Sequence, residues 1–184
     1  MEIDINQQKI SIGDKYKIFI DGKQKYIASR QLLSLLAVVY LYELDSERAR
    51  MTINRLFSWF RPKYDITRWD NNVLEFRTVS FWKCEYECQV GQDCYHIYGH
   101  RGRKYSIYKN DKQIAWWNKN AVSWFAGDNY KIISDADADI DLLISFCLII
   151  DNFSSDSGKG NTINIDLGNI GFQARKFDPA WQPK

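Results

Sequence analysis

Hydrophobic and polar residues alternate with a period of two along much of the chain. In residues 48–54, Ala49, Met51 and Ile53 share one face while basic and polar residues occupy the other, and residues 83–90 repeat this alternation. No amphipathic pattern of helical length interrupts such segments before residue 135. Each segment therefore predicts a strand with one face toward a core and the other toward water.

Turn signals such as Asp21-Gly22, Asp70-Asn71-Asn72 and Asn110-Asp111 separate these segments and predict consecutive hairpins. An open sheet of so many strands would curl or split, so closure into a barrel or a sandwich is favoured. The strands that we expect are 15–20, 24–30, 37–44, 48–54, 63–69, 73–78, 84–90, 94–99, 103–109, 112–118 and 129–134, with 8–12 as a further candidate.

One stretch near the C-terminus, DADADIDLLISFCLIIDN at 135–152, combines acidic residues with a long apolar run. Its apolar part, 142–150, would be about 14 Å long as a helix, whereas a bilayer core needs about 30 Å. Ser134 and Asp137 have the spacing of a capping box, and aspartates suit the first turn of a helix. The apolar residues surround the helix on all sides. We therefore predict a helix at about 135–151, buried all round, as inside a closed sheet.

The aspartates of this stretch also suggest a calcium site, because calcium prefers several carboxylate ligands. Counted from Asp135 as in an EF-hand loop, however, the sixth and twelfth positions are Ile140 and Phe146, where the motif needs glycine and glutamate. The acidic residues are therefore expected to begin a helix.

The segment Gly127-Asp-Asn-Tyr-Lys-Ile132, the acidic residues after it and the apolar run from Asp139 to Asp151 resemble the closing motif of the LURP-one-related family. That family belongs to the tubby C-terminal-like superfamily, together with the phospholipid scramblases, and the resemblance covers roughly 8–152. It implies a mainly β fold, a closed and mostly antiparallel barrel of about twelve strands around a central hydrophobic C-terminal helix.

The resemblance also implies what kind of function to expect. Tubby members bind phosphoinositide headgroups on the barrel wall through basic side chains, scramblases are linked to membranes and calcium, and the LURP-one branch has no settled biochemical role. The residues that bind lipid in tubby proteins have no match in this chain, so no site is transferred.

We expect two parts, a barrel with its helix in residues 1–152 and a polar linker with a C-terminal extension in 153–184. Within the extension, 162–167 alternates like a strand, and Phe172, Phe177 and Trp181 are apolar anchors. The extension could add an edge strand, bind its own barrel or dock on a second copy.

The 25 basic and 23 acidic residues leave a formal charge of +2, so nucleic acid is not an expected partner and any basic site must be local. We expect the basic residues to lie on outer faces, near exposed aromatic residues such as Trp59 and Trp117. His100-Arg-Gly-Arg-Lys104 is a basic turn that could hold a phosphate. The candidate ligand-binding residues are Lys15, Lys17, Arg48, Arg50, Arg61, Lys63, Arg101, Arg103 and Lys104, with Lys131 as a further basic position.

Cysteine and histidine chemistry gives no comparable signal. Cys84, Cys88, Cys94 and His96 offer zinc ligands, but they lack tight CxxC spacing, and Cys84 and Cys88 are expected in a core. Nothing in the pattern holds a histidine beside a nucleophilic thiol. We therefore expect no enzyme activity, no metal and no cofactor.

The N-terminal MEIDINQQKI lacks the features of a secretory signal, and the chain has no transmembrane segment, so we expect a cytoplasmic protein, with peripheral membrane association as an option. The preferred hypothesis is a non-enzymatic module that binds an anionic ligand, such as a phospholipid headgroup, on the barrel wall. The alternative is a structural or stress-associated protein-interaction domain without a small-molecule ligand.

Overall fold

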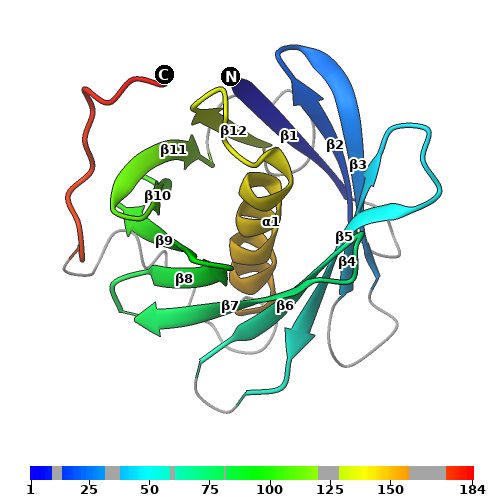
Figure 1. Cartoon of the computed structure of the whole chain (residues 1–184), viewed down its shortest axis with the longest axis horizontal. Helices are drawn as coiled ribbons and strands as arrows, with labels where there is room; N and C mark the ends of the chain where they lie inside the picture. Colours follow the sequence, from blue (N-terminus) through cyan, green and yellow to red (C-terminus); the bar gives the residue numbers. More distant parts are fainter. Residues whose placement is uncertain (10–13, 32–37, 59–60, 81, 120–128, 158–172) are drawn as a thin grey trace.

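A computed structural model describes residues 1–9, 14–31, 38–58, 61–80, 82–119, 129–157 and 173–184, and for Lys9 and 153–157 only the backbone. Within these residues the chain forms twelve strands that close into a barrel, and one helix (Figure 1). The strands are β1 (Glu2–Lys9), β2 (Asp14–Ile20), β3 (Lys23–Gln31), β4 (Val38–Glu43), β5 (Ala49–Leu56), β6 (Lys63–Arg68), β7 (Val73–Ser80), β8 (Glu85–Val90), β9 (Asp93–His100), β10 (Lys104–Lys109), β11 (Lys112–Asn118) and β12 (Asn129–Ser134).

Each strand pairs antiparallel with the next one along the chain, and β1 pairs with β12 to close the ring. Successive connections therefore alternate between the two ends of the barrel. We call the end that carries the turns at 21–22, 69–72 and 110–111 the entry rim, because the chain passes through 135–139 there into the helix. The other end, which includes the turn at 101–103, is the exit rim.

The two-residue turns form because their residues tolerate positive φ. Asp21 and Gly22 have φ of 47° and 78°, and Asn110 and Asp111 have φ of 48° and 66°. Such a pair matches the twist of the strands that it joins. The turn signals in the sequence therefore mark real hairpins.

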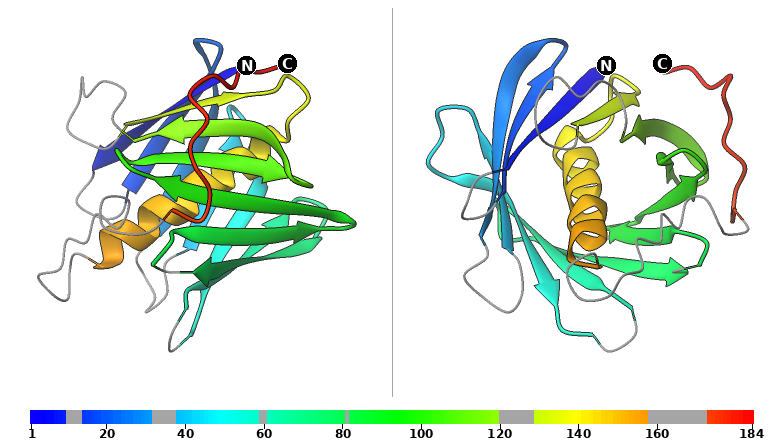
Figure 2. Two further views of the ribbon diagram at one scale, coloured as in Figure 1. Left: turned by 90° about the vertical axis from the view of Figure 1, so that its left-hand side faces the viewer. Right: turned by 180° about the vertical axis from the view of Figure 1, so that it is seen from behind.

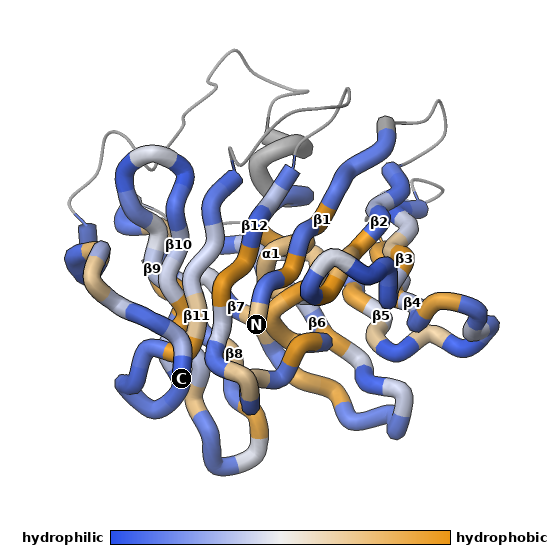
Figure 3. Tube along the Cα trace, turned by 90° about the horizontal axis from the view of Figure 1, so that it is seen from above, coloured by the Kyte–Doolittle hydropathy of each residue, from blue (hydrophilic) through white to orange (hydrophobic). Residues whose placement is uncertain are grey.

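The helix α1 (Ile140–Ser157) lies inside the ring of strands (Figures 1 and 2). Its residues from Leu142 to Ile150 are buried, and Phe146 packs with ring centroids 5.7 Å from Phe76 and 5.8 Å from Tyr95. Hydrophobic and hydrophilic residues alternate along the strands that surround it (Figure 3). The prediction of a closed barrel around a hydrophobic helix is confirmed.

The first strand differs from the prediction. β1 occupies Glu2–Lys9, where the sequence suggested 8–12, of which 10–12 fall outside the described residues. Only Ile3 and Ile5 reach the core from this segment, and its pairing with β12 joins residues far apart in the sequence. The local pattern of hydrophobic residues was too short to identify it.

The helix begins later than predicted, at Ile140, and ends later, at Ser157, so it includes the first residues of the predicted linker. The proposed capping box is wrong. The N–H of Ser134 bonds to the carbonyl of Met1 and that of Asp135 to the carbonyl of Ile114, so sheet pairing continues through both residues. The carboxylate of Asp139 instead accepts the Leu142 N–H at 3.1 Å and caps the helix. Only Asp141 lies in the first helical turn.

We expect alkaline pH to unfold the protein well before the peptide chain itself is damaged. Burial raises the pKa of Tyr26 and of Cys88 to about 12 each and raises the pKa of Tyr16 and Tyr86 above the ordinary value. In the unfolded chain these phenols ionise near pH 10 and the thiol near pH 9. Because the folded values are higher, their contribution to stability is complete below the unfolded pKa and is lost as pH rises toward about 12.

Urea unfolding followed by circular dichroism should therefore give a free energy of unfolding that falls steadily above about pH 9. Tyr26→Phe removes one of the responsible groups, so its stability should depend less steeply on pH. An unchanged free energy of unfolding up to about pH 12 would contradict this prediction.

Candidate functional site

The structure places the nine basic candidates at three different levels of the barrel. Lys17 lies on the wall in β2, as Lys131 does in β12, while Arg48 and Arg50 lie at the entry rim. The six at the exit rim are Lys15, Arg61, Lys63, Arg101, Arg103 and Lys104.

Two arginines at the entry rim hold the start of the helix, whereas Arg48 donates to the carbonyl of Trp69 at 2.6 Å. Arg50 donates to the carboxylate of Asp141 at 2.8 Å and lies 3.8 Å from Glu43, and Arg68 pairs with Asp139. The hydrogen bond that Arg50 donates to Asp141 raises the pKa of the Arg50 guanidinium. Arg50 therefore has its counterions within its own chain.

At the exit rim, two neighbouring connections are tied together. Arg61 donates from Nη1 to the carbonyl of Val79 at 2.8 Å, and Thr78 Oγ1 donates to the carbonyl of Pro62 at 3.0 Å. These bonds join the chain between β5 and β6 to the end of β7. Lys83, which the sequence interpretation did not include, lies exposed on the next connection, between β7 and β8.

Two large aromatic side chains are exposed on these same connections. Phe57 is 74% exposed and Trp82 is 72% exposed. Together with Arg61, Lys63 and Lys83 they form what we call the exit-rim patch, in which the Lys63 ammonium also lies 3.6 Å from the exposed Glu75 carboxylate. Aromatic and cationic side chains in such a group suit the boundary between water and an apolar, negatively charged surface.

The expectation of exposed Trp59 and Trp117 has a different outcome. Trp59 lies outside the described residues. Trp117 is only 1% exposed and stacks inside the barrel on Tyr105, with ring centroids 4.8 Å apart, so its prediction is wrong. Because Trp116 and Trp117 are adjacent in β11, the sequence does not show which of them faces outward. In the structure, Trp116 is the one on the outer wall.

The entry rim carries an excess of acidic residues, which outnumber the exposed basic residues Lys23, Lys25, Arg48 and Lys112 in and beside its turns. Exposed acidic residues occupy its turns and the approach to the helix, whereas the exposed ionic residues of the described exit-rim turns are mainly basic. The exposed acids of the entry rim are Asp21, Glu43, Asp45, Glu47, Asp70, Asp111 and Asp137. Charge is therefore separated along the barrel axis, although the whole chain is nearly neutral.

Inside the exit end, a single carboxylate fastens the helix to the barrel. Asp151 is buried and accepts hydrogen bonds from Tyr16 at 3.1 Å, from Lys119 at 3.3 Å and from Tyr130. Its lysine and tyrosine partners come from β2, β12 and the end of β11. This set is consistent with a structural role for Asp151.

The described part of the C-terminal extension, residues 173–184, lies on the outer wall of its own barrel (Figure 2). Phe177 packs 5.2 Å from His100 and 5.6 Å from Trp116, and the Lys104 ammonium lies 5.0 Å from its ring. Trp181 Nε1 donates to the carbonyl of Gln113 at 3.2 Å. Of the three options for the extension, these residues follow the second, binding to their own barrel. Residues 162–167 and Phe172 lie outside the described residues.

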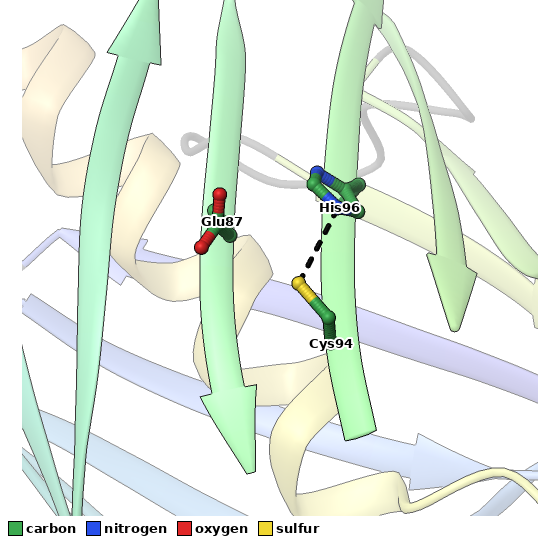
Figure 4. Close-up of side chains that lie close together, drawn as sticks. All are labelled: Glu87, Cys94 and His96. Carbon is green, nitrogen blue, oxygen red and sulfur yellow. Dashed lines mark hydrogen bonds between the residues drawn. The ribbon is translucent and has the colours of Figure 1, made fainter. Parts of the chain in front are cut away.

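The cysteines considered as zinc ligands lie on both sides of the barrel wall. Cys84 and Cys88 are buried in the core, as predicted, whereas Cys94 and His96 lie on the outer wall in β9. The Cys94 Sγ is 3.3 Å from His96 Nε2, so a histidine does lie beside a thiol, contrary to the sequence interpretation. Glu87 of β8 pairs directly with His96 across the sheet and completes a cluster on the wall (Figure 4).

His100, the other histidine, is buried beside a buried serine hydroxyl. Its Nε2 lies 2.7 Å from Ser106 Oγ, and burial lowers its pKa. The neighbouring turn residues Arg101 and Arg103 are exposed at the exit rim. Basic charge and exposed aromatic side chains are therefore the features with which the described residues of the exit rim can bind a ligand.

Comparison with known proteins gives one match. A family model described as LURP-one-related matches residues 1–151. No curated protein and no solved structure matches the chain. Among the described residues, α1 does not combine the length and apolar character that a membrane-crossing helix requires.

Proposed function

Because this chain belongs to the LURP-one-related family, we propose that it is a non-enzymatic binding module whose exit-rim patch docks on anionic phospholipid headgroups. The family and the closed barrel are consistent with a binding module and with the tubby C-terminal-like superfamily. The observation that carries the proposal is the exposure of Phe57 and Trp82 beside Arg61, Lys63 and Lys83.

The physical basis is a combination of two weak attractions. Each lysine or arginine near an anionic membrane surface contributes about 1 kcal/mol, and that attraction is screened by salt. Exposed aromatic rings lie favourably at the level of the headgroups, where one edge is apolar and the other is wet. The exit-rim patch supplies both attractions on neighbouring connections, so several weak contacts would act together.

The opposite rim supports a single docking orientation. Its exposed aspartates and glutamates would be repelled by the same membrane. Arg48 and Arg50 lie at that rim, and Arg50 is held by Asp141 and Glu43. The proposal therefore leaves these two arginines out of the lipid-binding set.

Charge reversal at the patch should weaken membrane binding strongly. We expect Lys63→Glu combined with Lys83→Glu to reduce affinity for phosphatidylserine-containing vesicles by at least about tenfold, because two attractive charges become repulsive. Vesicle co-sedimentation at low and at physiological salt measures this effect, and the wild-type affinity should fall as salt increases.

A matched control uses two lysines at the other rim. Lys23→Glu combined with Lys25→Glu makes the same change in net charge on exposed residues at the start of β3 and should leave vesicle binding nearly unchanged. Trp82→Ser should weaken binding without any change in charge. Equal and negligible binding of the wild type to phosphatidylcholine and phosphatidylserine vesicles would refute the proposed function.

The alternative, a protein-interaction domain without a small ligand, has less support. Phe177 and Trp181, the aromatic residues of the described part of the extension, contact the barrel of the same chain. A partner captured in pull-down experiments and lost when the chain is cut after Asn152 would favour this alternative.

A further inference from the structure

Three metal-binding types of side chain meet on the outer wall of the barrel, away from the exit-rim patch. Glu87 is in β8, and Cys94 and His96 are in β9, two residues apart and therefore on the same face. One ligand atom from each lies within 4.8 Å of the others (Figure 4). All three residues are partly buried, so the cluster is sheltered but still reachable from solvent.

Neighbouring residues hold the three side chains in place. Arg77 donates to Glu87 Oε1 at 2.8 Å and leaves the second carboxylate oxygen available. The His96 ring stacks with Tyr98, with centroids 6.1 Å apart and planes at 12°. Asn110 Oδ1 accepts the backbone N–H of Cys94 at 2.9 Å. Ligands that are positioned before binding lose little conformational freedom when a metal arrives.

We propose that Glu87, Cys94 and His96 bind Zn²⁺ on the outer wall of the barrel, with the fourth coordination position open. Thiolate, imidazole and carboxylate are the ligands that zinc takes in proteins, and three protein ligands are typical of sites that exchange their fourth ligand. A thiolate and an imidazole do not suit calcium or magnesium, which prefer oxygen ligands. The site is independent of the proposed membrane function and uses none of its residues.

The number of protons released when Zn²⁺ binds gives a direct test of this site. An ordinary cysteine thiol carries its proton at neutral pH and binds zinc only as the thiolate. On binding, the S–H bond is replaced by an S–Zn bond and the proton goes to the buffer. Cys94 therefore contributes one proton to the total released with each Zn²⁺ that binds, and the Cys94→Ser variant lacks this contribution.

The experiment titrates the full chain with Zn²⁺ in competition with a chromophoric chelator, and in parallel with Co²⁺. We expect one Zn²⁺ per chain and a thiolate-to-cobalt charge-transfer absorption band. Cys94→Ser, His96→Ala and Glu87→Gln should each weaken Zn²⁺ binding by at least about tenfold, since even outer-shell partners are worth about 10–100-fold. The cobalt band should disappear in Cys94→Ser.

Two matched variants separate this site from general metal binding by the protein. Glu85→Gln changes a carboxylate on the same strand, and Cys88→Ala removes a thiol that faces the core. Both should keep the wild-type Zn²⁺ affinity as long as circular dichroism shows them folded. Wild-type affinity in a folded Cys94→Ser variant, or a cobalt complex without thiolate absorption, would overturn the proposal.

Discussion

Replacing Ile144 by aspartate is expected to abolish folding of the chain. Ile144 is fully buried in the helix, within a core shared by α1 and the barrel strands. A carboxylate there must either stay charged in an apolar core or bind a proton and bury an unpaired polar group, and either costs several kcal/mol. Because the whole domain has only about 5–15 kcal/mol of stability, we expect insoluble protein or a chain without a cooperative unfolding transition.

The control for this substitution changes the same side chain without adding charge. Ile144→Val removes one methylene group and should cost about 0.5–1.5 kcal/mol in urea unfolding while the protein stays folded. An Ile144→Asp variant that is monomeric and unfolds cooperatively would show that the helix is not a buried core element.

The second large effect is expected at the opposite end of the helix core. Asp151→Ala leaves Lys119 as a charge with little exposure and removes the acceptor of the Tyr16 and Tyr130 hydroxyl groups. Removing one partner of a buried ion pair typically costs about 3–5 kcal/mol, because the remaining charge is left uncompensated. Urea unfolding at neutral pH measures this loss.

Two further variants identify its cause. Asp137→Ala removes an exposed aspartate at the entry rim and should change stability very little. Lys119→Met added to Asp151→Ala removes the charge that has lost this carboxylate and should recover part of the loss, in the manner of a double-mutant cycle. An Asp151→Ala protein as stable as the wild type would exclude the structural role assigned to Asp151.

The parts of the fold that could be predicted from sequence are those that local patterns determine. Turn residues with positive φ, such as Asp21 and Gly22, marked hairpins, and the apolar run from Leu142 to Ile150, interrupted by one serine, marked a buried helix. The parts that could not be predicted depend on distant pairing. Strand β1 is defined mainly by its two neighbours in the closed ring, and Ser134 is held in the sheet by Met1.

The candidate sites illustrate the same division. The alternation of residues along each strand assigns the basic side chains to outer faces. Which of them share a rim depends on the path of the chain around the closed ring, and six of the nine lie at the exit rim. Glu87 was missed as a neighbour of His96, although the hairpin turn at 91–92 contained the signal. Once Val90 pairs with Asp93 across that turn, antiparallel register places Glu87 opposite His96.

The separation of acidic and basic rims has a kinetic consequence. A nearly neutral molecule with opposite charges at its two ends is an electric dipole, and the field of a charged surface turns such a molecule before contact. Long-range steering acts mainly on the rate of association, while short-range contacts govern the rate of dissociation. In stopped-flow mixing with anionic vesicles, added salt should therefore lower the association rate constant much more than it raises the dissociation rate constant.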